Sequence, residues 1–206
     1  MRSWILAGVG MVLALGAAGC RAVPEEVHLT RGFADPATPY GAALARYTRY
    51  AELYNGLDTV AKGWATWRSP ELREALVESS IAAYGLGPEE ADRLRAEQER
   101  AARRVREFHL ALYTPARDWN DLESPDTLWR LSLELPDGTR LAPLQVVHIP
   151  KTAKVPVEYP YVSPWTREYT LFFPLVEGRE THRSLTLVLS GPLGTMRFRF
   201  GPGRGR

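Results

Sequence analysis

Apolar residues recur at helical spacing through the first half of the chain. From Pro39 to about Thr66 they follow one another at steps of three, four or seven residues, so they would share one helix face, with a bend or break expected near Gly56. A second helix is predicted to begin at Ser69-Pro70-Glu71, because Ser caps a helix, Pro fits its first turn and Glu suits its positive end. A third helix is predicted from Pro88 to Leu112. The three helices would fill residues 38–113.

After Thr114-Pro115 the pattern changes to alternating apolar and polar residues, which is typical of half-buried strands. Asp137-Gly138 predicts a hairpin turn. The expected fold class is α+β, with an N-terminal bundle of about three helices packed on a C-terminal antiparallel β-sandwich of five to seven strands at residues 114–200. Residues 201–206 are predicted to be a disordered tail. The clearest expected strands lie at 129–135, 141–149, 169–173, 185–189 and 196–200.

The first 19 residues have the layout of a signal peptide. Arg2 provides a positive start, Trp4 to Leu15 is apolar, and small residues lead to Cys20. The apolar run is shorter than the roughly 20 residues that a transmembrane helix needs. Two alternatives to lipid attachment at Cys20 are possible for such a segment. Ordinary signal peptidase could remove it and the protein would be secreted, or the segment could be retained as a membrane anchor.

The run Leu15-Gly16-Ala17-Ala18-Gly19-Cys20 resembles the lipobox of bacterial lipoproteins. That resemblance implies lipidation of the Cys20 thiol, cleavage before Cys20 and acylation of the new amino terminus. Several acyl chains would hold the protein firmly on a membrane. Arg21 stands where Asp usually signals inner-membrane retention, so the resemblance favours the outer membrane. Residues 20–37, which have no apolar periodicity, are interpreted as a flexible tether.

Composition is that of a globular protein, with 45% hydrophobic and 24% charged residues. The single cysteine is Cys20, so no thiol remains for a disulfide and the fold must be stable through packing. The net charge of +2 gives no indication of nucleic-acid binding.

Linear signatures of catalysis are missing, including those of serine hydrolases, zinc proteases and phosphate-binding loops. We therefore expect no enzyme activity and no cofactor. An active site built from dispersed carboxylates leaves no linear signature and stays open.

Carboxylates cluster between the predicted helices and the first strand, where Asp118, Asp121 and Glu123 are weak candidates for Ca²⁺ ligands. Leu122 stands where a calcium-binding loop would place another oxygen ligand. Asp and Asn are also common turn formers, so a structural junction is the favoured interpretation and no metal is predicted.

The connection from Pro150 to Thr166 is long and proline-rich, and it carries Tyr159, Tyr161 and Trp165. Long loops are often functional, and rigid aromatic side chains suit the binding of sugars or peptides. The alternative is a segment that caps the sandwich with its rings buried.

These observations predict a cell-envelope protein that is attached by lipid on Cys20 to a membrane, with the outer membrane as the expected location. It would act as a non-catalytic interaction or scaffold component with an envelope protein partner. A glycan- or peptidoglycan-binding module that uses the loop at 150–166 is the alternative.

Overall fold

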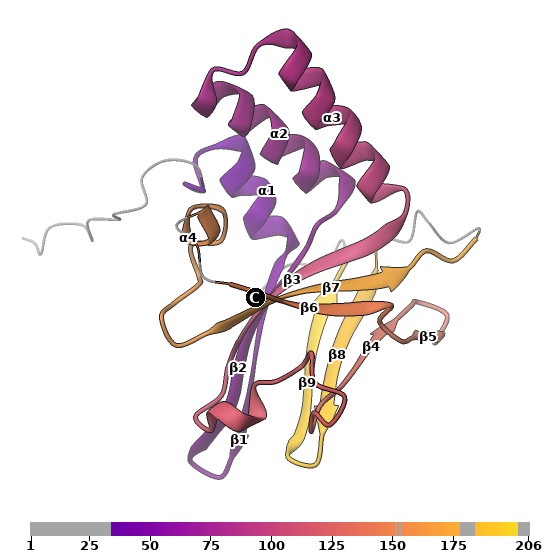
Figure 1. The fold of residues 1–206 in the computed structure, drawn as a ribbon. Helices are drawn as coiled ribbons and strands as arrows, with labels where there is room; N and C mark the ends of the chain where they lie inside the picture. Colours follow the sequence, from indigo (N-terminus) through magenta and orange to yellow (C-terminus); the bar gives the residue numbers. More distant parts are fainter. Residues whose placement is uncertain (1–33, 151, 153, 178–183, 202–206) are drawn as a thin grey trace, which may run out of the picture.

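The computed structural model describes residues 34–150, 152, 154–177 and 184–201. Two antiparallel sheets pack face to face, and the helices gather on the outer face and at one end of the larger sheet (Figure 1). The predicted mixture of helices with antiparallel sheets is therefore confirmed. The predicted signal peptide, Cys20, most of the predicted tether and residues 202–206 lie outside the described residues. The elements are α1 (Pro39–Tyr47), β1 (Thr48–Asn55), β2 (Asp58–Trp67), α2 (Pro70–Tyr84), α3 (Pro88–Ala102), β3 (Val105–Tyr113), η1 (Arg117–Trp119), β4 (Arg130–Glu134), β5 (Arg140–Leu141), β6 (Gln145–Ile149), α4 (Lys154–Glu158), β7 (Arg167–Pro174), β8 (Leu185–Gly191) and β9 (Gly194–Phe200).

The larger sheet has the strand order β1-β2-β3-β7-β6, and the smaller has the order β5-β4-β8-β9. Every pair of neighbouring strands is antiparallel. Helices α2 and α3 interrupt the chain between β2 and β3, which are direct neighbours in the sheet. We call residues 69–104, which hold these two helices, the helical arm. In the part of the chain that the structure describes, no helix is both long and apolar enough to span a membrane.

The helix predicted from Pro39 to Thr66 is wrong beyond Tyr47, where a hairpin of β1 and β2 begins. Steps of four residues also keep side chains on one face of a strand, so the spacing that indicated a helix fits both structures. Gly56 adopts φ of 62° in the turn of this hairpin. The residue that was expected to bend a helix therefore reverses the direction of the chain.

The third predicted helix is also too long. It ends at Ala102, and Val105–Tyr113 forms β3 at the centre of the larger sheet. Almost every residue of β3 is buried, since the sheet is covered on both sides there. A strand buried on both faces gives a continuous apolar run without alternation, which sequence periodicity cannot distinguish from a buried helix.

Local signals at the ends of elements predicted the structure well. The Ser69 hydroxyl accepts a hydrogen bond from the Leu72 amide at the start of α2. Gly85 ends that helix with φ of 61°, and Gly138 occupies the predicted hairpin turn with φ of 85°. The strand expected over residues 141–149 is divided into β5 and β6, which belong to different sheets.

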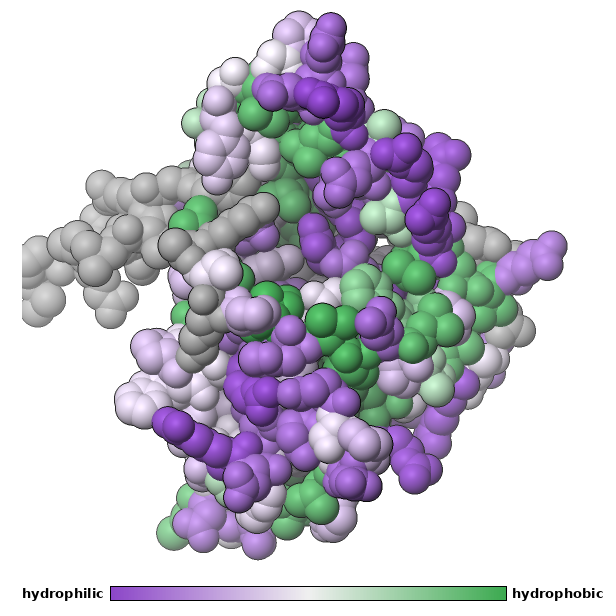
Figure 2. Space-filling model, viewed as in Figure 1, coloured by the Kyte–Doolittle hydropathy of each residue, from purple (hydrophilic) through white to green (hydrophobic). Residues whose placement is uncertain are grey.

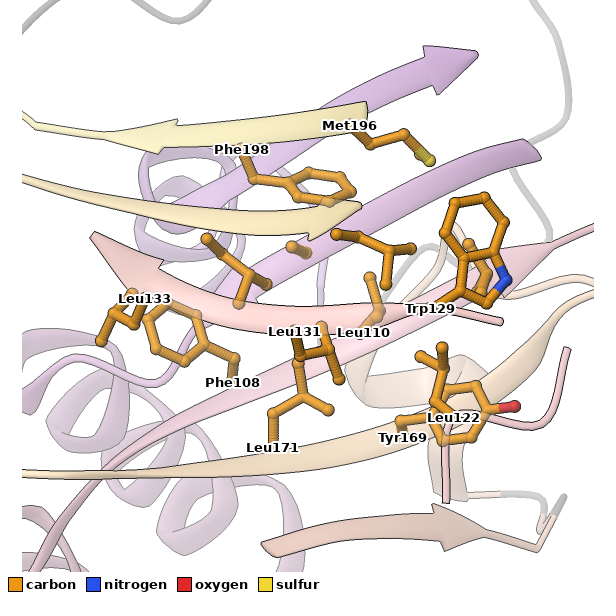
Figure 3. Packing of buried hydrophobic residues seen from close by; sticks show 14 of the residues in the cluster. Phe108, Leu110, Leu122, Trp129, Leu131, Leu133, Tyr169, Leu171, Met196 and Phe198 are labelled. Atoms are coloured by element: carbon orange, nitrogen blue, oxygen red, sulfur yellow. The ribbon is translucent and has the colours of Figure 1, made fainter. Parts of the chain in front are cut away.

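Side chains from the inner faces of both sheets form the main core (Figure 3). Phe108 and Leu110 of β3 face Leu131 and Leu133 of β4 across the gap between the sheets. Phe108 is fully buried and packs edge-on against the ring of Phe173, at a centroid distance of 5.8 Å. The fold cannot rely on disulfides for its stability, and the close packing of aromatic and branched side chains between the two sheets provides it instead.

Candidate binding surface

The proline-rich connection crosses the outer face of the larger sheet and includes the short helix α4. Val155 and Tyr159 are buried there in a small cluster with Tyr40 and Leu44 of α1. Tyr161 is half-buried, whereas Trp165 is 71% exposed. The three aromatic residues singled out in the sequence therefore have different surroundings, and only Trp165 projects from the surface.

Tyr159 and Tyr161 enclose His109, which points outward from β3. The rings of His109 and Tyr159 are stacked with their centroids 3.8 Å apart. His109 Nδ1 lies 3.0 Å from the Tyr161 hydroxyl, which in turn lies 2.6 Å from Thr66 Oγ1. The aromatic cover is therefore fixed to β2 and β3 by a chain of hydrogen bonds.

On its other side His109 faces Glu168 of β7, with Nε2 3.4 Å from Oε2. The Thr166 hydroxyl donates a 2.6 Å hydrogen bond to the second oxygen of Glu168. His109 is 2% exposed and Glu168 is fully buried. Burial, and secondarily the charge of Arg68, lowers the pKa of His109 to about 3, so the ring is neutral at pH 7.

A buried ionic cluster joins the helical arm to the sheet. Glu107 of β3 accepts hydrogen bonds from Arg68 at 2.7 Å and from Arg73 of α2 at 2.5 Å. Arg73 also donates to the side chain of Gln98 on α3 at 2.7 Å. Burial alone would raise the pKa of Glu107, but the two guanidinium groups outweigh burial and lower that pKa.

Beside this cover the outer face of β2 and β3 is open. An open cavity of about 420 Å³ is lined by residues of β2, β3 and the end of the connection, and we call it the aromatic groove. Trp165 and Tyr113 contribute rings, while Lys62 and Ser163 contribute polar groups. The lining residues are Lys62, Trp64, Tyr113, Ser163, Trp165 and Thr166.

One ring of the groove, that of Trp64, is held in place by its neighbours. Trp64 lies between Tyr50 and Tyr161, with ring centroids 4.8 Å and 6.3 Å away. Glu52 accepts hydrogen bonds from the hydroxyls of Tyr50 and Tyr54 at 2.6 Å and 2.9 Å. These two hydrogen bonds lower the pKa of Glu52, so the carboxylate stays charged at neutral pH. A ligand in the groove would therefore meet a Trp64 ring that is already packed against its neighbours.

The second large cavity, of about 590 Å³, lies between α2 and α3 and ends at Leu175. Its lining contains both arginine and glutamate side chains. Exposed residues among them form ion pairs, such as Arg95 with Glu78 at 3.0 Å. Figure 2 shows hydrophilic residues along the helical arm, with hydrophobic residues between its helices. Its balanced charges favour neither an anionic nor a cationic ligand.

Two of the three carboxylates that were considered as calcium ligands are paired with other side chains. Asp121 accepts from the Thr127 hydroxyl at 2.8 Å, Glu123 pairs with Arg167 at 2.5 Å, and Asp118 lies in η1. Within the described ranges, no three His, Cys, Asp or Glu residues are grouped so that they could hold a metal ion.

Sequence reasoning missed most of the groove. The periodicity predicts that Trp64 lies on the apolar face of a helix, whereas Trp64 is in β2 and is the cross-strand partner of Tyr50 on β1. The usable signal was the alternation of Tyr50, Glu52 and Tyr54, since three such residues at steps of two lie on one face of a strand.

No protein-family model and no curated protein sequence matches the chain. Among solved structures, the chain resembles the crystal structure of a novel protein of unknown function from Burkholderia pseudomallei K96243. The two share 12% sequence identity with a TM-score of 0.40, over 79% of this chain and 82% of that one. A likeness at this level supports no statement about function.

Proposed function

We propose that this chain is a lipid-anchored protein of the cell envelope, placed at the outer membrane, which acts by binding an envelope partner and not by catalysis. The observation that carries the binding role is the aromatic groove, which the exposed Trp165 lines together with the rings of Trp64 and Tyr113. The lipobox-like run that ends at Cys20 supports the anchor.

The surroundings of His109 support binding over acid–base chemistry. A general base has to reach the proton that it removes, within hydrogen-bonding distance or through one water molecule. His109 and Glu168 are buried, and Tyr159 covers the imidazole face. Their hydrogen bonds to Tyr161 and Thr166 give them a structural role in fixing the connection over the sheet.

Photocrosslinking of the full chain in intact cells tests the binding role. A photoreactive phenylalanine analogue would replace Trp165 in one variant and Tyr84 in another. Tyr84 is a matched control because it is an aromatic residue, 64% exposed, near the end of α2. The proposal expects a discrete protein adduct from position 165 and not from position 84. Equal adducts from both positions, or none from position 165, would contradict it.

A glycan is the second candidate ligand, and the open shape of the groove favours it. Sugar rings present apolar C–H faces that pack on aromatic rings, and their hydroxyls hydrogen-bond to polar groups at the edge. The groove offers both kinds of contact, since Lys62 and Ser163 flank the rings of Trp64 and Trp165. The Trp64 ring is also packed against Tyr50 and Tyr161, which reduces the entropic cost of binding to it.

Sedimentation with purified peptidoglycan sacculi tests this second function. Trp165→Ala should weaken binding by about tenfold, the loss expected for one aromatic contact near the centre of an interface. Tyr84→Ala should bind as the parent does. If Trp165→Ala and the parent sediment equally, the groove does not bind peptidoglycan.

The anchor is tested separately through Cys20→Ser in the full chain. The parent should fractionate with membranes and carry a mature N-terminus at Cys20 with the added mass of acyl chains. Cys20→Ser should lack the added mass of acyl chains. A parent N-terminus without that mass, or the same added mass in Cys20→Ser, would contradict lipid anchoring.

A further inference from the structure

The outer face of the smaller sheet carries a concentration of arginines. Because alternate residues of a strand point to the same side, Arg130 of β4 shares this face with Arg197 and Arg199 of β9. Arg140 of β5 lies next to Glu134 in the same sheet. We call these four arginines the basic face. The other members of the outer face on β4, β8 and β9 are Ser132, Glu134, Thr186, Val188, Ser190 and Thr195.

Glu134 is the single carboxylate among these outward residues. It pairs with Arg197 at 2.6 Å and with Arg140 at 3.0 Å. The hydrogen bond from Arg197 is the main reason why the pKa of Glu134 is lowered. Arg130 and Arg199 are exposed, and neither has an ion-pair partner within the described ranges. One carboxylate therefore serves four guanidinium groups, which leaves a clear positive excess.

A fifth arginine continues this charge around the edge of the sandwich. Arg49 of β1 donates a 2.8 Å hydrogen bond from Nε to the backbone oxygen of Arg199. Its guanidinium lies over the ring of Phe200, 5.7 Å from the centroid. The charge is thus held against the sheet and not at the end of a mobile side chain.

The rest of the molecule does not share this excess. The full chain carries a net charge of only +2, and the helical arm contains eight acidic and six basic residues. The basic face is therefore a local feature and not a consequence of an overall basic composition. Such an asymmetry can orient a protein in front of a negatively charged surface.

We propose that the basic face docks on an anionic lipid surface and orients the anchored domain there. This inference rests on the proposed lipid anchor for its location. Charge complementarity selects the partner, because guanidinium groups bind phosphate oxygens well and a sheet face meets a dense, extended layer of phosphates. The chain from Cys20 to Ala34 spans 14 residues, so it reaches at most about 48 Å. That reach lets any face of a domain of this size contact the membrane that holds the anchor.

Vesicle binding by the full chain with Cys20→Ser tests the docking without help from a lipid. Co-sedimentation would compare phosphatidylcholine vesicles with vesicles that also contain phosphatidylglycerol. Residues 1–19 are mostly apolar and would bind both kinds of vesicle, so the difference in affinity between the two measures the electrostatic contact. We expect tighter binding to the anionic vesicles, weakened by salt because the contact is electrostatic. The double variant Arg130→Gln/Arg199→Gln breaks no ion pair of the described residues and should weaken binding about 25-fold, or about fivefold per arginine.

Arg93→Gln/Arg100→Gln on α3 is the matched control, because it removes the same charge from exposed positions of the helical arm. It should bind anionic vesicles as the parent does. Equal losses in both double variants would mean that net charge alone decides the binding, and would overturn the proposal. Displacement by inorganic phosphate at the phosphate concentration of the vesicles would indicate an ion site instead of a bilayer contact, and would also overturn it. Because lipidation is assayed separately, failure of the docking does not imply failure of the anchor.

Discussion

His109 and Tyr159 lie face to face, with ring centroids 3.8 Å apart and planes inclined by 2°. Tyr159 comes from the connection between β6 and β7, and His109 from the centre of β3. This stack seals the outer face of the larger sheet over a histidine that has to remain neutral. Protonation would place a charge beneath the aromatic cover and next to Arg68, which already disfavours it.

The first prediction concerns the stability of the fold in acid. The pKa of His109 is about 3 in the folded chain against 6.5 when exposed, so the unfolded chain binds more protons between these values. The free energy of unfolding should therefore be highest above pH 6.5 and fall as the pH drops towards 3, by on the order of 3 to 5 kcal/mol from this group. Urea denaturation over that pH range measures the slope.

His109→Gln should flatten this slope, whereas His148→Gln should preserve it. His148 is exposed on β6 and packs edge-on near Tyr169, so it is a histidine without the burial that causes the effect. An unchanged slope in His109→Gln would show that other groups govern the acid stability.

A second prediction concerns Glu107. Glu107→Gln leaves the buried Arg73 and the half-buried Arg68 without their shared carboxylate, and should lower the free energy of unfolding by about 3–5 kcal/mol. Glu99→Gln is the control, since its pairing with Arg103 at 3.5 Å is exposed and such pairs contribute about 0–1 kcal/mol. Similar losses in the two variants, measured by chemical denaturation, would argue against a special role of the buried cluster.

A third prediction concerns the close contact between the sheets at Gly63. A Cβ atom there would lie 2.9 Å from Phe198 Cζ and 3.1 Å from Met196 Cε. Gly63→Val should therefore overpack the core and cost about 1–3 kcal/mol in thermal or chemical unfolding. Gly87→Ala, where a Cβ meets nothing within 4 Å, should cost less than Gly63→Val, its loss coming only from the weaker capping by Ala at the start of α3. Equal stability of Gly63→Val and the parent would mean that the sheets separate more easily than this packing implies.

A fourth prediction concerns the Tyr161 hydroxyl, which lies between Thr66 and His109. Tyr161→Phe keeps the ring but removes this hydroxyl, and should cost about 1–3 kcal/mol because the buried Nδ1 of His109 loses its partner, whereas Thr66 keeps its hydrogen bond with Thr48. Tyr50→Phe, whose hydroxyl reaches only the exposed Glu52, should cost less than that. A smaller loss for Tyr161→Phe than for Tyr50→Phe, measured by urea denaturation, would contradict the ranking.

The sequence predicted elements best where a local chemical signal marks their ends. Ser69-Pro70 and Gly85 act within a few residues of their own position, so the limits of α2 could be read without knowledge of the fold. β1 and β3 were missed for a different reason. Their strand character depends on neighbours that are distant in sequence, such as the pairing of β3 with β7.

The groove was harder to predict for the same reason. Trp165 could be identified because it lies in an unusual loop, but Trp64 and Tyr113 come together with it only after β2 and β3 pair. The sequence also gave no means to decide that Tyr159 is covered while Trp165 is open. That difference depends on how α1 and α4 pack over the sheet.

The helical arm leaves and rejoins the sheet at almost the same point. Trp67 and Phe108 are paired residues in neighbouring strands, and the Arg68 amide donates a 2.9 Å hydrogen bond to the Glu107 carbonyl. A short turn could therefore replace the whole excursion without disturbing the register of any strand. Such a deletion would leave Glu107 with Arg68 alone and would also take Leu72 of α2 out of the apolar cluster that it forms with Tyr40 and Leu44. The arm is therefore held to the rest of the fold by one ionic cluster and one apolar contact.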